Sequence, residues 1–374
     1  MNQKFIIVGA PITALGGTIR RLRLWLGNVP EGSQVAFLYF SNNSERSLFP
    51  EAARLSNVRL VYSALMGRWG RVLVLPATMA VIREILRYRA SVLVSFFPWT
   101  MFAAGIATRI AGKIGLKIRH VIYLAGDPVP PEAGPWARRI YRLLFRMTLR
   151  MCDEVVVLSK GMADDLRRDY GLLHKLQVRV VPISIEGANL TAESNLRVRQ
   201  PSEVVFGAVA RLQPGKGFDV GLRALAIVTK QVAARLVIYG TGPDAGHLHD
   251  LACELGISEY VEFRGWIADP LEAYRLMDCV LLPSISEGTP RSLLEAASVG
   301  VPMIASSVGG IPDLIEHENT GWLVPPGDVQ ALALVMLDII RRRDILVVVG
   351  SRAREMVKAR PTPSEEIQAV FGYQ

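Results

Sequence analysis

The sequence predicts an α/β protein built from two parallel-sheet domains in tandem. Short apolar runs alternate with helical stretches along most of the chain, which is typical of parallel sheets with helical crossovers. The alternation breaks over 185–202, where periodicity is lost and polar residues accumulate, and it then restarts. A chain of 374 residues is also long for a single core. We therefore expect a first domain at 1–184, a linker at 185–202, a second domain at 203–356 and a C-terminal segment at 357–374.

The first domain is expected to contain strands at Phe5–Val8, Val35–Tyr39, Val58–Tyr62, Ser91–Ser95, Arg119–Leu124, Asp153–Ser159 and Gln177–Pro182, and helices at Pro76–Arg89 and Trp136–Arg150. A glycine pair, Gly16 and Gly17, follows the first strand and precedes a helix that can begin at Thr18. Glycines in such a loop allow backbone N–H groups to approach a phosphate. The alternative is a plain strand-to-helix turn.

The predicted helix Trp136–Arg150 is basic on one side and apolar on another. Its arginines recur every four residues, at Arg138, Arg142, Arg146 and Arg150, and its apolar side contains Ile140, Leu143, Leu144 and Met147. One interpretation is contact with an anionic membrane surface or a lipid-phosphate acceptor. The other is the solvated outer face of an ordinary α/β helix.

Charge is distributed unevenly along the chain. Residues 1–200 contain 28 Lys and Arg against 13 Asp and Glu, whereas the remainder contains 15 against 21, for a net charge of +9. A basic half is compatible with anionic lipid, nucleic acid or an acidic substrate. We expect no nucleic-acid partner, because the sequence lacks an aromatic-interleaved basic run, zinc-ligand spacing and an RNP-like strand.

The remaining composition favours a cytoplasmic protein. Cys152, Cys253 and Cys279 have no disulfide or metal spacing, so we expect small core residues in a reducing compartment. The N-terminal stretch lacks the apolar region and cleavage site of a signal peptide. The longest mainly apolar run, Val72–Ile82, contains Pro76 and is too short to span a bilayer.

The second domain repeats the alternation. Strands are expected at Val204–Ala208, Arg235–Tyr239, Val261–Phe263, Cys279–Pro283 and Met303–Ala305, with helices at Asp219–Val232 and Tyr274–Met277 and a further helix after Thr289. Thr289 can cap that helix, with Pro290 in its first turn, and Gly300 and Pro302 can end it.

Two glutamates in this last segment are candidates for ligand binding. Glu287 lies in the loop before the helix, and Glu295 lies about five residues into it, roughly 7 Å along its axis. Both carboxylates can face one crevice at the carboxyl ends of parallel strands, with a helix N-terminus between them that favours an anion. This arrangement suits a phosphate flanked by hydroxyl groups, as in a sugar nucleotide. The alternative is that both glutamates are solvated.

Two cations follow the strand Val204–Ala208. Arg211 and Lys216 bracket a Pro-Gly turn, and together they can neutralise a diphosphate without a metal. Solvated loop cations are the alternative. The turn at Gly240 and Gly242 is a weak dinucleotide signal because the third glycine is missing. We find no dedicated metal site, although single aspartates such as Asp127 remain open candidates.

Five motifs occur in order along the second domain, and together they resemble the retaining glycosyltransferases of family 4. These motifs are Arg211 with Lys216-Gly217, Gly240-Thr241-Gly242-Pro243, Phe263-Arg264-Gly265, Ser286-Glu287-Gly288-Thr289-Pro290 through Leu294-Glu295-Ala296, and Gly309-Gly310-Ile311-Pro312-Asp313. Glu287 and Glu295 fall at the family's E-x7-E spacing. The resemblance implies the GT-B fold, in which two Rossmann-like domains face each other across a ligand cleft.

The resemblance also implies roles for individual residues. Arg211 and Lys216 would bind the donor diphosphate, Glu295 the ribose hydroxyls and Glu287 the donor sugar. Gly288, Thr289 and Pro290 would line the donor pocket with Gly240 and Gly242, and Gly16 and Gly17 would approach the phosphates. Members often have a histidine after the strand equivalent to Arg119–Leu124, but this chain continues with Ala125-Gly126-Asp127. Either Asp127 takes that polar role in the acceptor domain or no side chain does.

The resulting functional prediction is a retaining hexosyltransferase. It would move a sugar from a UDP- or GDP-linked donor to a hydroxyl of a glycan or lipid-linked acceptor, with no cofactor and no metal, in cell-surface polysaccharide or lipopolysaccharide biosynthesis. It would be cytoplasmic, with peripheral contact at the inner face of the cell membrane. Two alternatives stay open: a catalytically silent subunit that binds sugar nucleotides, and a nucleotide-sugar epimerase of the same fold. Family members often return to the first domain through a C-terminal helix, for which the short segment Pro361–Gln374 is a candidate.

Overall fold

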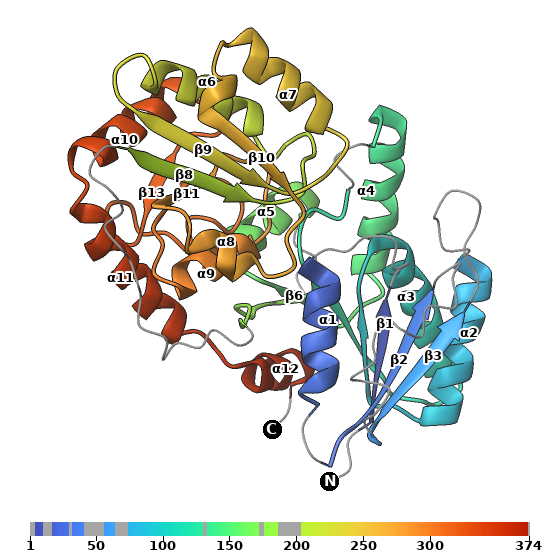
Figure 1. Ribbon diagram of the computed structural model, residues 1–374. Coiled ribbons are helices and arrows are strands. Elements are labelled where there is room, and N and C mark those ends of the chain that lie inside the picture. Colours follow the sequence, from blue (N-terminus) through green and yellow to red (C-terminus); the bar gives the residue numbers. More distant parts are fainter. Residues whose placement is uncertain are drawn as a thin grey trace. The chain divides into compact units, whose positions relative to one another are not determined.

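A computed structural model describes residues 4–9, 17–29, 32–40, 56–63, 74–129, 133–171, 176–185 and 203–372 (Figure 1). The chain divides into two compact units. Unit 1 comprises Met1–Glu186 together with Pro361–Gln374, and unit 2 comprises Gly187–Arg360.

Unit 1 is built on a parallel sheet with strand order β3-β2-β1-β4-β5-β6-β7 in its described part. Its strands are β1 (Lys4–Gly9), β2 (Gln34–Phe40), β3 (Val58–Ser63), β4 (Val92–Ser95), β5 (Arg119–Leu124), β6 (Glu154–Val157) and β7 (Gln177–Val180). Its helices are α1 (Gly17–Gly27), α2 (Val74–Tyr88), α3 (Pro98–Lys113), α4 (Pro135–Leu149), α5 (Lys160–Tyr170) and α12 (Pro363–Phe371). The strand order reverses between β1 and β4, which is where ligand crevices form in open α/β sheets.

The two faces of this sheet are covered by different helices. The fully buried Ile6 and Leu38 pack with Val81 of α2 and Ala104 of α3 in one apolar layer. On the other face, α1 lies beside α12 (Figure 1), and Phe371 of α12 packs edge-on against Phe5, with ring centroids 4.6 Å apart. The C-terminal helix therefore completes the core of unit 1.

Helix α12 is anchored through a buried carboxylate. Glu366 is fully buried, and its Oε2 accepts hydrogen bonds from the backbone N–H and the hydroxyl of Ser184, both at 2.6 Å. Its Oε1 accepts from Trp25 Nε1 and Tyr123 OH, each at 3.2 Å, and lies 3.6 Å from Arg21 Nε. Every acceptor position of this carboxylate is thus used within unit 1. The helix periodicity of the sequence did not reveal these partners.

Unit 2 is built on a second parallel sheet, with order β10-β9-β8-β11-β12-β13 in its described part. Its strands are β8 (Val204–Val209), β9 (Ala234–Tyr239), β10 (Val261–Gly265), β11 (Cys279–Leu282), β12 (Met303–Ser306) and β13 (Trp322–Val324). Its helices are α6 (Phe218–Val228), α7 (Ala245–Glu254), α8 (Pro270–Tyr274), α9 (Arg291–Ser298), α10 (Val329–Arg341) and α11 (Ile345–Lys358). The order reverses between β8 and β11, so the loops that follow these two strands flank the position where ligands bind in open α/β sheets.

Several expected elements are displaced in the structure. The helix predicted at Tyr274–Met277 is instead α8, because Asp269 caps it by accepting a hydrogen bond from the backbone N–H of Leu271 and Pro270 occupies its first turn. The strand predicted to reach Ser159 ends at Val157, since the Ser159 hydroxyl caps α5. Cys253, expected in a core, is exposed on α7. In the part of the chain described, no helix is long and apolar enough to cross a membrane.

Candidate functional site

The candidate site of unit 2 lies at the β8/β11 reversal point. Lys216 follows β8, Glu287 follows β11, and these two strands are hydrogen-bonded neighbours. Lys216 Nζ lies 2.5 Å from Glu287 Oε1, which also accepts a 3.0 Å hydrogen bond from the Ser284 hydroxyl. Among the residues described, Oε2 of Glu287 has no hydrogen-bond donor. One oxygen of this carboxylate is therefore fixed by the protein, and the other is available to a ligand.

Four loops at the carboxyl edge of this sheet pack backbone against backbone. A Cβ added at Gly217 would lie 1.8 Å from the carbonyl oxygen of Pro283, and one at Gly309 would lie 1.9 Å from that of Glu287. The same holds at Gly240 and Gly242, where the nearest carbonyl oxygens would be at 1.9 and 2.0 Å. Real Cβ atoms do not approach this closely, so glycine is required at each position. The site loops are thereby held together without side chains.

Helix α9 begins directly after the Glu287 loop and has no side-chain cap. Pro290, with φ −73° and ψ 115°, occupies the N-cap position, and the first helical residue is Arg291. The prediction that Thr289 caps the helix with Pro290 in its first turn is therefore wrong, because the extended ψ of Pro290 delays the helix by one residue. Thr289 is buried in the loop, and Gly288 accepts a 2.8 Å hydrogen bond from the N–H of Gly310. The first N–H groups of a helix have no intrahelical acceptor, so this terminus attracts anions.

Glu295 lies on the inward side of α9 and is buried. Its Oε1 accepts a 2.8 Å hydrogen bond from Nε of Arg291, one helical turn earlier, and both side chains are largely shielded from solvent. The two glutamates of the E-x7-E pattern thus have separate basic partners, Lys216 and Arg291. The sequence reasoning did not consider Arg291, although its i,i+4 spacing from Glu295 signals such a pair.

Arg211 lies on the loop after β8 and is exposed. The loop is held by a 3.0 Å hydrogen bond from the N–H of Leu212 to the carbonyl of Thr241, between Gly240 and Gly242. In the described part of the chain, the Arg211 guanidinium has no acidic partner. Its charge is therefore free to meet an anion at the carboxyl edge of the sheet.

The candidates in unit 1 are placed differently. Gly17 is the first residue of α1, whereas Gly16 lies outside the described residues. Asp127 is exposed after β5, and its Oδ1 accepts a 2.8 Å hydrogen bond from the N–H of Val129. Burial raises the pKa of Tyr170 to about 12, and the nearby negative charge of Asp127 adds to this rise. The loop thus presents a carboxylate whose second oxygen is unused by the described residues.

Strand β5 also contains a histidine, but it is not positioned for catalysis. His120 is fully buried, and its Nε2 lies 2.8 Å from the Ser95 hydroxyl. Burial disfavours the imidazolium form and lowers the pKa of His120 to about 4. Within the ranges described, no group of three or more His, Cys, Asp or Glu side chains is arranged to hold a metal ion.

Comparison with known proteins identifies the family to which this chain belongs. Residues 16–184 match the family model described as glycosyl transferase 4-like domain, and residues 203–342 match that of glycosyl transferases group 1. The fold is that of GT-B glycosyltransferases: the structure of HepE from Anabaena in complex with UDP superposes with a TM-score of 0.79 over 98% of both chains, at 20% identity. The chain belongs to the group 1 glycosyltransferases of family 4 type.

Curated relatives fit this assignment. The GDP-mannose-dependent alpha-(1-6)-phosphatidylinositol monomannoside mannosyltransferase of Mycobacterium tuberculosis is 34% identical over 178 residues, which cover 45% of this chain and 46% of the relative. The amylovoran biosynthesis glycosyltransferase AmsK of Erwinia amylovora is 31% identical over 196 residues, covering 48% and 46%. The chain thus spans about half the length of the curated relatives that it matches.

Proposed function

We propose that this protein transfers a hexosyl group from a nucleotide-diphosphate sugar to a hydroxyl acceptor with retention of anomeric configuration. The observation that carries the proposal is the Lys216–Glu287 pair at the β8/β11 reversal point, beside the uncapped N-terminus of α9. This arrangement brings positive charge and a carboxylate oxygen to one crevice. In a nucleotide-diphosphate sugar, the phosphates would meet the positive charge and the sugar hydroxyls would donate to the carboxylate oxygen.

In this proposal, the cations stabilise the leaving group. As the anomeric C–O bond breaks, negative charge develops on the nucleoside diphosphate. Lys216 and Arg211, with the open N–H groups of α9, are proposed to bind its phosphate oxygens. Preorganised positive charge at such a position lowers the barrier because it stabilises the transition state more than the ground state. No metal is needed for this step in the proposal.

The two glutamates have separate roles in the proposal. Glu287 uses its free Oε2 to accept hydrogen bonds from hydroxyls of the donor sugar, while Lys216 and Ser284 fix Oε1. Glu295 accepts hydrogen bonds from the ribose hydroxyls and is oriented by Arg291. Gly240, Gly242 and the Gly288–Pro290 backbone line the donor pocket. Asp127 in unit 1 is proposed to make a polar contact with the acceptor hydroxyl.

The comparisons support a UDP or GDP donor and a surface-glycan product. The Anabaena structure binds UDP, the mycobacterial relative is GDP-mannose-dependent, and AmsK takes part in amylovoran biosynthesis. We propose by analogy that the acceptor is a growing cell-surface polysaccharide or lipopolysaccharide, and that the reaction takes place in the cytoplasm at the inner face of the cell membrane.

Thermal unfolding with a panel of nucleotides and nucleotide sugars tests the donor site. A ligand that binds the folded state raises the unfolding midpoint by mass action. We expect UDP or GDP and its sugars to raise it in the wild type and in the control Arg223→Ala, an exposed position on α6. Lys216→Ala should lose most of this shift.

Activity assays with the donor so identified test the chemistry. Glu287→Ala should lower transfer or donor hydrolysis at least about a hundredfold, the size typical of lost transition-state contacts. Nuclear magnetic resonance of the product should show the donor's anomeric configuration. Full transfer by both Lys216→Ala and Glu287→Ala would exclude the proposed site. Donor binding without transfer or hydrolysis would support the catalytically silent subunit instead.

A further inference from the structure

Helix α4 exposes an apolar stripe to solvent. Its members are spaced i, i+4, i+7 and i+11, and they are Trp136 (76% exposed), Ile140 (50%), Leu143 (60%) and Met147 (41%). The helical periodicity of the sequence places Ile140, Leu143 and Met147 on one apolar side, and the structure shows that this side faces solvent. A contiguous exposed apolar patch on a folded chain marks an interaction surface.

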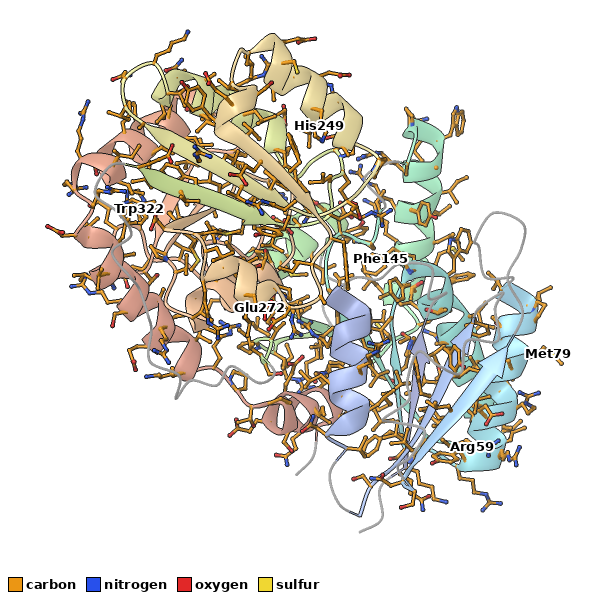
Figure 2. All side chains as sticks on the ribbon, viewed as in Figure 1. Arg59, Met79, Phe145, His249, Glu272 and Trp322 are labelled. Carbon is orange, nitrogen blue, oxygen red and sulfur yellow. The ribbon has the colours of Figure 1, made fainter. Side chains whose placement is uncertain are left out.

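The opposite side of α4 is the one that packs on unit 1. Phe145, Thr148 and Leu149 are buried, and the Phe145 ring lies 4.9 Å from that of Tyr170 (Phe145 is labelled in Figure 2). At about 100° per residue, the four stripe residues fall within an arc of about 60° centred away from this packed side. The stripe residues therefore face away from the core of unit 1.

Arginines flank the stripe on one side. Arg139, Arg142, Arg146 and Arg150 occupy the next sector of the helix surface, and all four are exposed. No Asp or Glu occurs in α4, and in the described part of the chain none of these four arginines has an ion-pair partner. Arg139 lies 5.5 Å from the Trp136 ring centroid. The surface thus combines apolar side chains with unneutralised positive charge.

Helix α2 provides a comparison, because it also exposes apolar residues but has less positive charge beside them. Leu75, Met79 and Leu86 are also exposed along one side of that helix, and Met79 extends from its outer side in Figure 2. Yet α2 carries fewer cations, and Arg83 there is paired with Glu84. Of the two stripes, α4 is the one with a charge complement for an anionic partner.

We propose that α4 docks on the surface of an anionic lipid bilayer. The apolar stripe would enter the boundary between headgroups and acyl chains, Trp136 would lie in the interfacial layer, and the arginines would meet lipid phosphates. This surface belongs to unit 1, whereas the proposed donor site is built from residues of unit 2. Docking of α4 on lipid does not depend on which donor the protein binds.

Vesicle sedimentation of the full-length protein tests this docking. We expect binding to vesicles of equal parts phosphatidylcholine and phosphatidylglycerol, little binding to phosphatidylcholine alone, and weakening as salt rises. Leu143→Glu places a carboxylate in the stripe and should lower the partition coefficient at least about tenfold. The matched control is Leu334→Glu, at a residue of α10 that is 65% exposed, and it should bind as the wild type does.

Three results would overturn the proposal: a wild-type protein that ignores the anionic vesicles, a Leu143→Glu variant that binds them normally, or equal losses in both variants. Light scattering adds a further readout, because a wild-type dimer that Leu143→Glu converts to a monomer would identify the stripe as a contact between copies. Stabilisation of Leu143→Glu by UDP or GDP would show that unit 2 is intact, so that a lipid-binding defect is distinguishable from failure of the donor proposal.

Discussion

Helices α9 and α12 both carry a buried glutamate, but their ends are treated in opposite ways. Thr362 begins α12 with a complete capping box to Glu365, and Arg119 and Arg179 donate to carbonyls of its last turn. Helix α9 begins at Pro290 with no side-chain cap. The chain thus satisfies its own polar groups at α12 and leaves the N-terminus of α9 open.

Glu366 of α12 and Glu287, in the loop before α9, differ in the same sense. Glu366 of α12 has all its acceptor positions occupied by residues of unit 1. Glu287, which precedes α9, has one oxygen that no described residue uses. A carboxylate whose acceptor positions are all hydrogen-bonded within the protein stabilises the fold. A carboxylate with an unused oxygen beside an uncapped helix N-terminus is suited to binding a ligand. This contrast separates a structural anchor from a candidate site within one chain.

The largest expected effect is on the anchor. Glu366→Ala removes the partner of Arg21, Trp25 and Ser184 and should lower the free energy of unfolding by about 3–5 kcal/mol, as for other broken buried ion pairs. Glu287→Ala leaves the Lys216 ammonium without its partner, but that side chain is 21% exposed and can be hydrated, so the variant should cost less, about 1–2 kcal/mol. Urea unfolding followed by tryptophan fluorescence measures both. Equal costs for the two variants would contradict the distinction drawn here.

Acid should act on unit 1 through His120. Burial lowers its pKa from 6.5 to about 4, so between these values the unfolded chain binds a proton that the folded chain does not. Above pH 6.5, His120 is neutral in both states and does not reduce the free energy of unfolding. As pH falls from 6.5 towards 4, the free energy of unfolding decreases by a total on the order of 3 kcal/mol. Hydrogen exchange should show β5 losing protection across this window. In His120→Gln that pH dependence should be absent; its persistence would point to another group.

The smallest effect tests the open helix end. Pro290 already has an extended N-cap backbone, so Pro290→Asp can supply a cap and stabilise the protein by about 0.5–1 kcal/mol. The new carboxylate competes with phosphate, so nucleoside diphosphate affinity should fall at least about tenfold, measured by calorimetry. Thr362→Ala on α12 should instead lose about 1 kcal/mol and leave nucleotide affinity unchanged. An unaltered affinity in Pro290→Asp would show that the α9 terminus does not bind phosphate.

The parallel sheets could be predicted from sequence because their strands are nearly continuous apolar runs. The positions of the strands around Val204–Val209 and Cys279–Leu282 followed from this pattern, as did the loops carrying Lys216 and Glu287. Helix boundaries were less secure. Thr289 is a residue type that often caps helices, but the extended ψ of Pro290 makes α9 begin one residue later. Residue propensities do not predict the ψ angle of an individual proline.

Contacts between distant segments were beyond the sequence. Glu366 meets Ser184 across 182 residues, and nothing in the local pattern marks either residue as a partner. The same limit applied to α4, where a helical apolar pattern indicates a side but not whether Leu143 faces the core or solvent. The roles of Arg211, Lys216, Glu287 and Glu295 remain predictions that the experiments above are designed to decide.

The backbone packing around Gly217, Gly240, Gly242 and Gly309 also bears on how donor preference can change by mutation. Any side chain at these positions would collide with a carbonyl oxygen, so they are closed to substitution whatever donor is used. Variation must enter through neighbours whose side chains leave the loops, such as the exposed Pro214 and Thr241. A library that fixes the glycines and randomises these neighbours would therefore sample new specificities within a folded population.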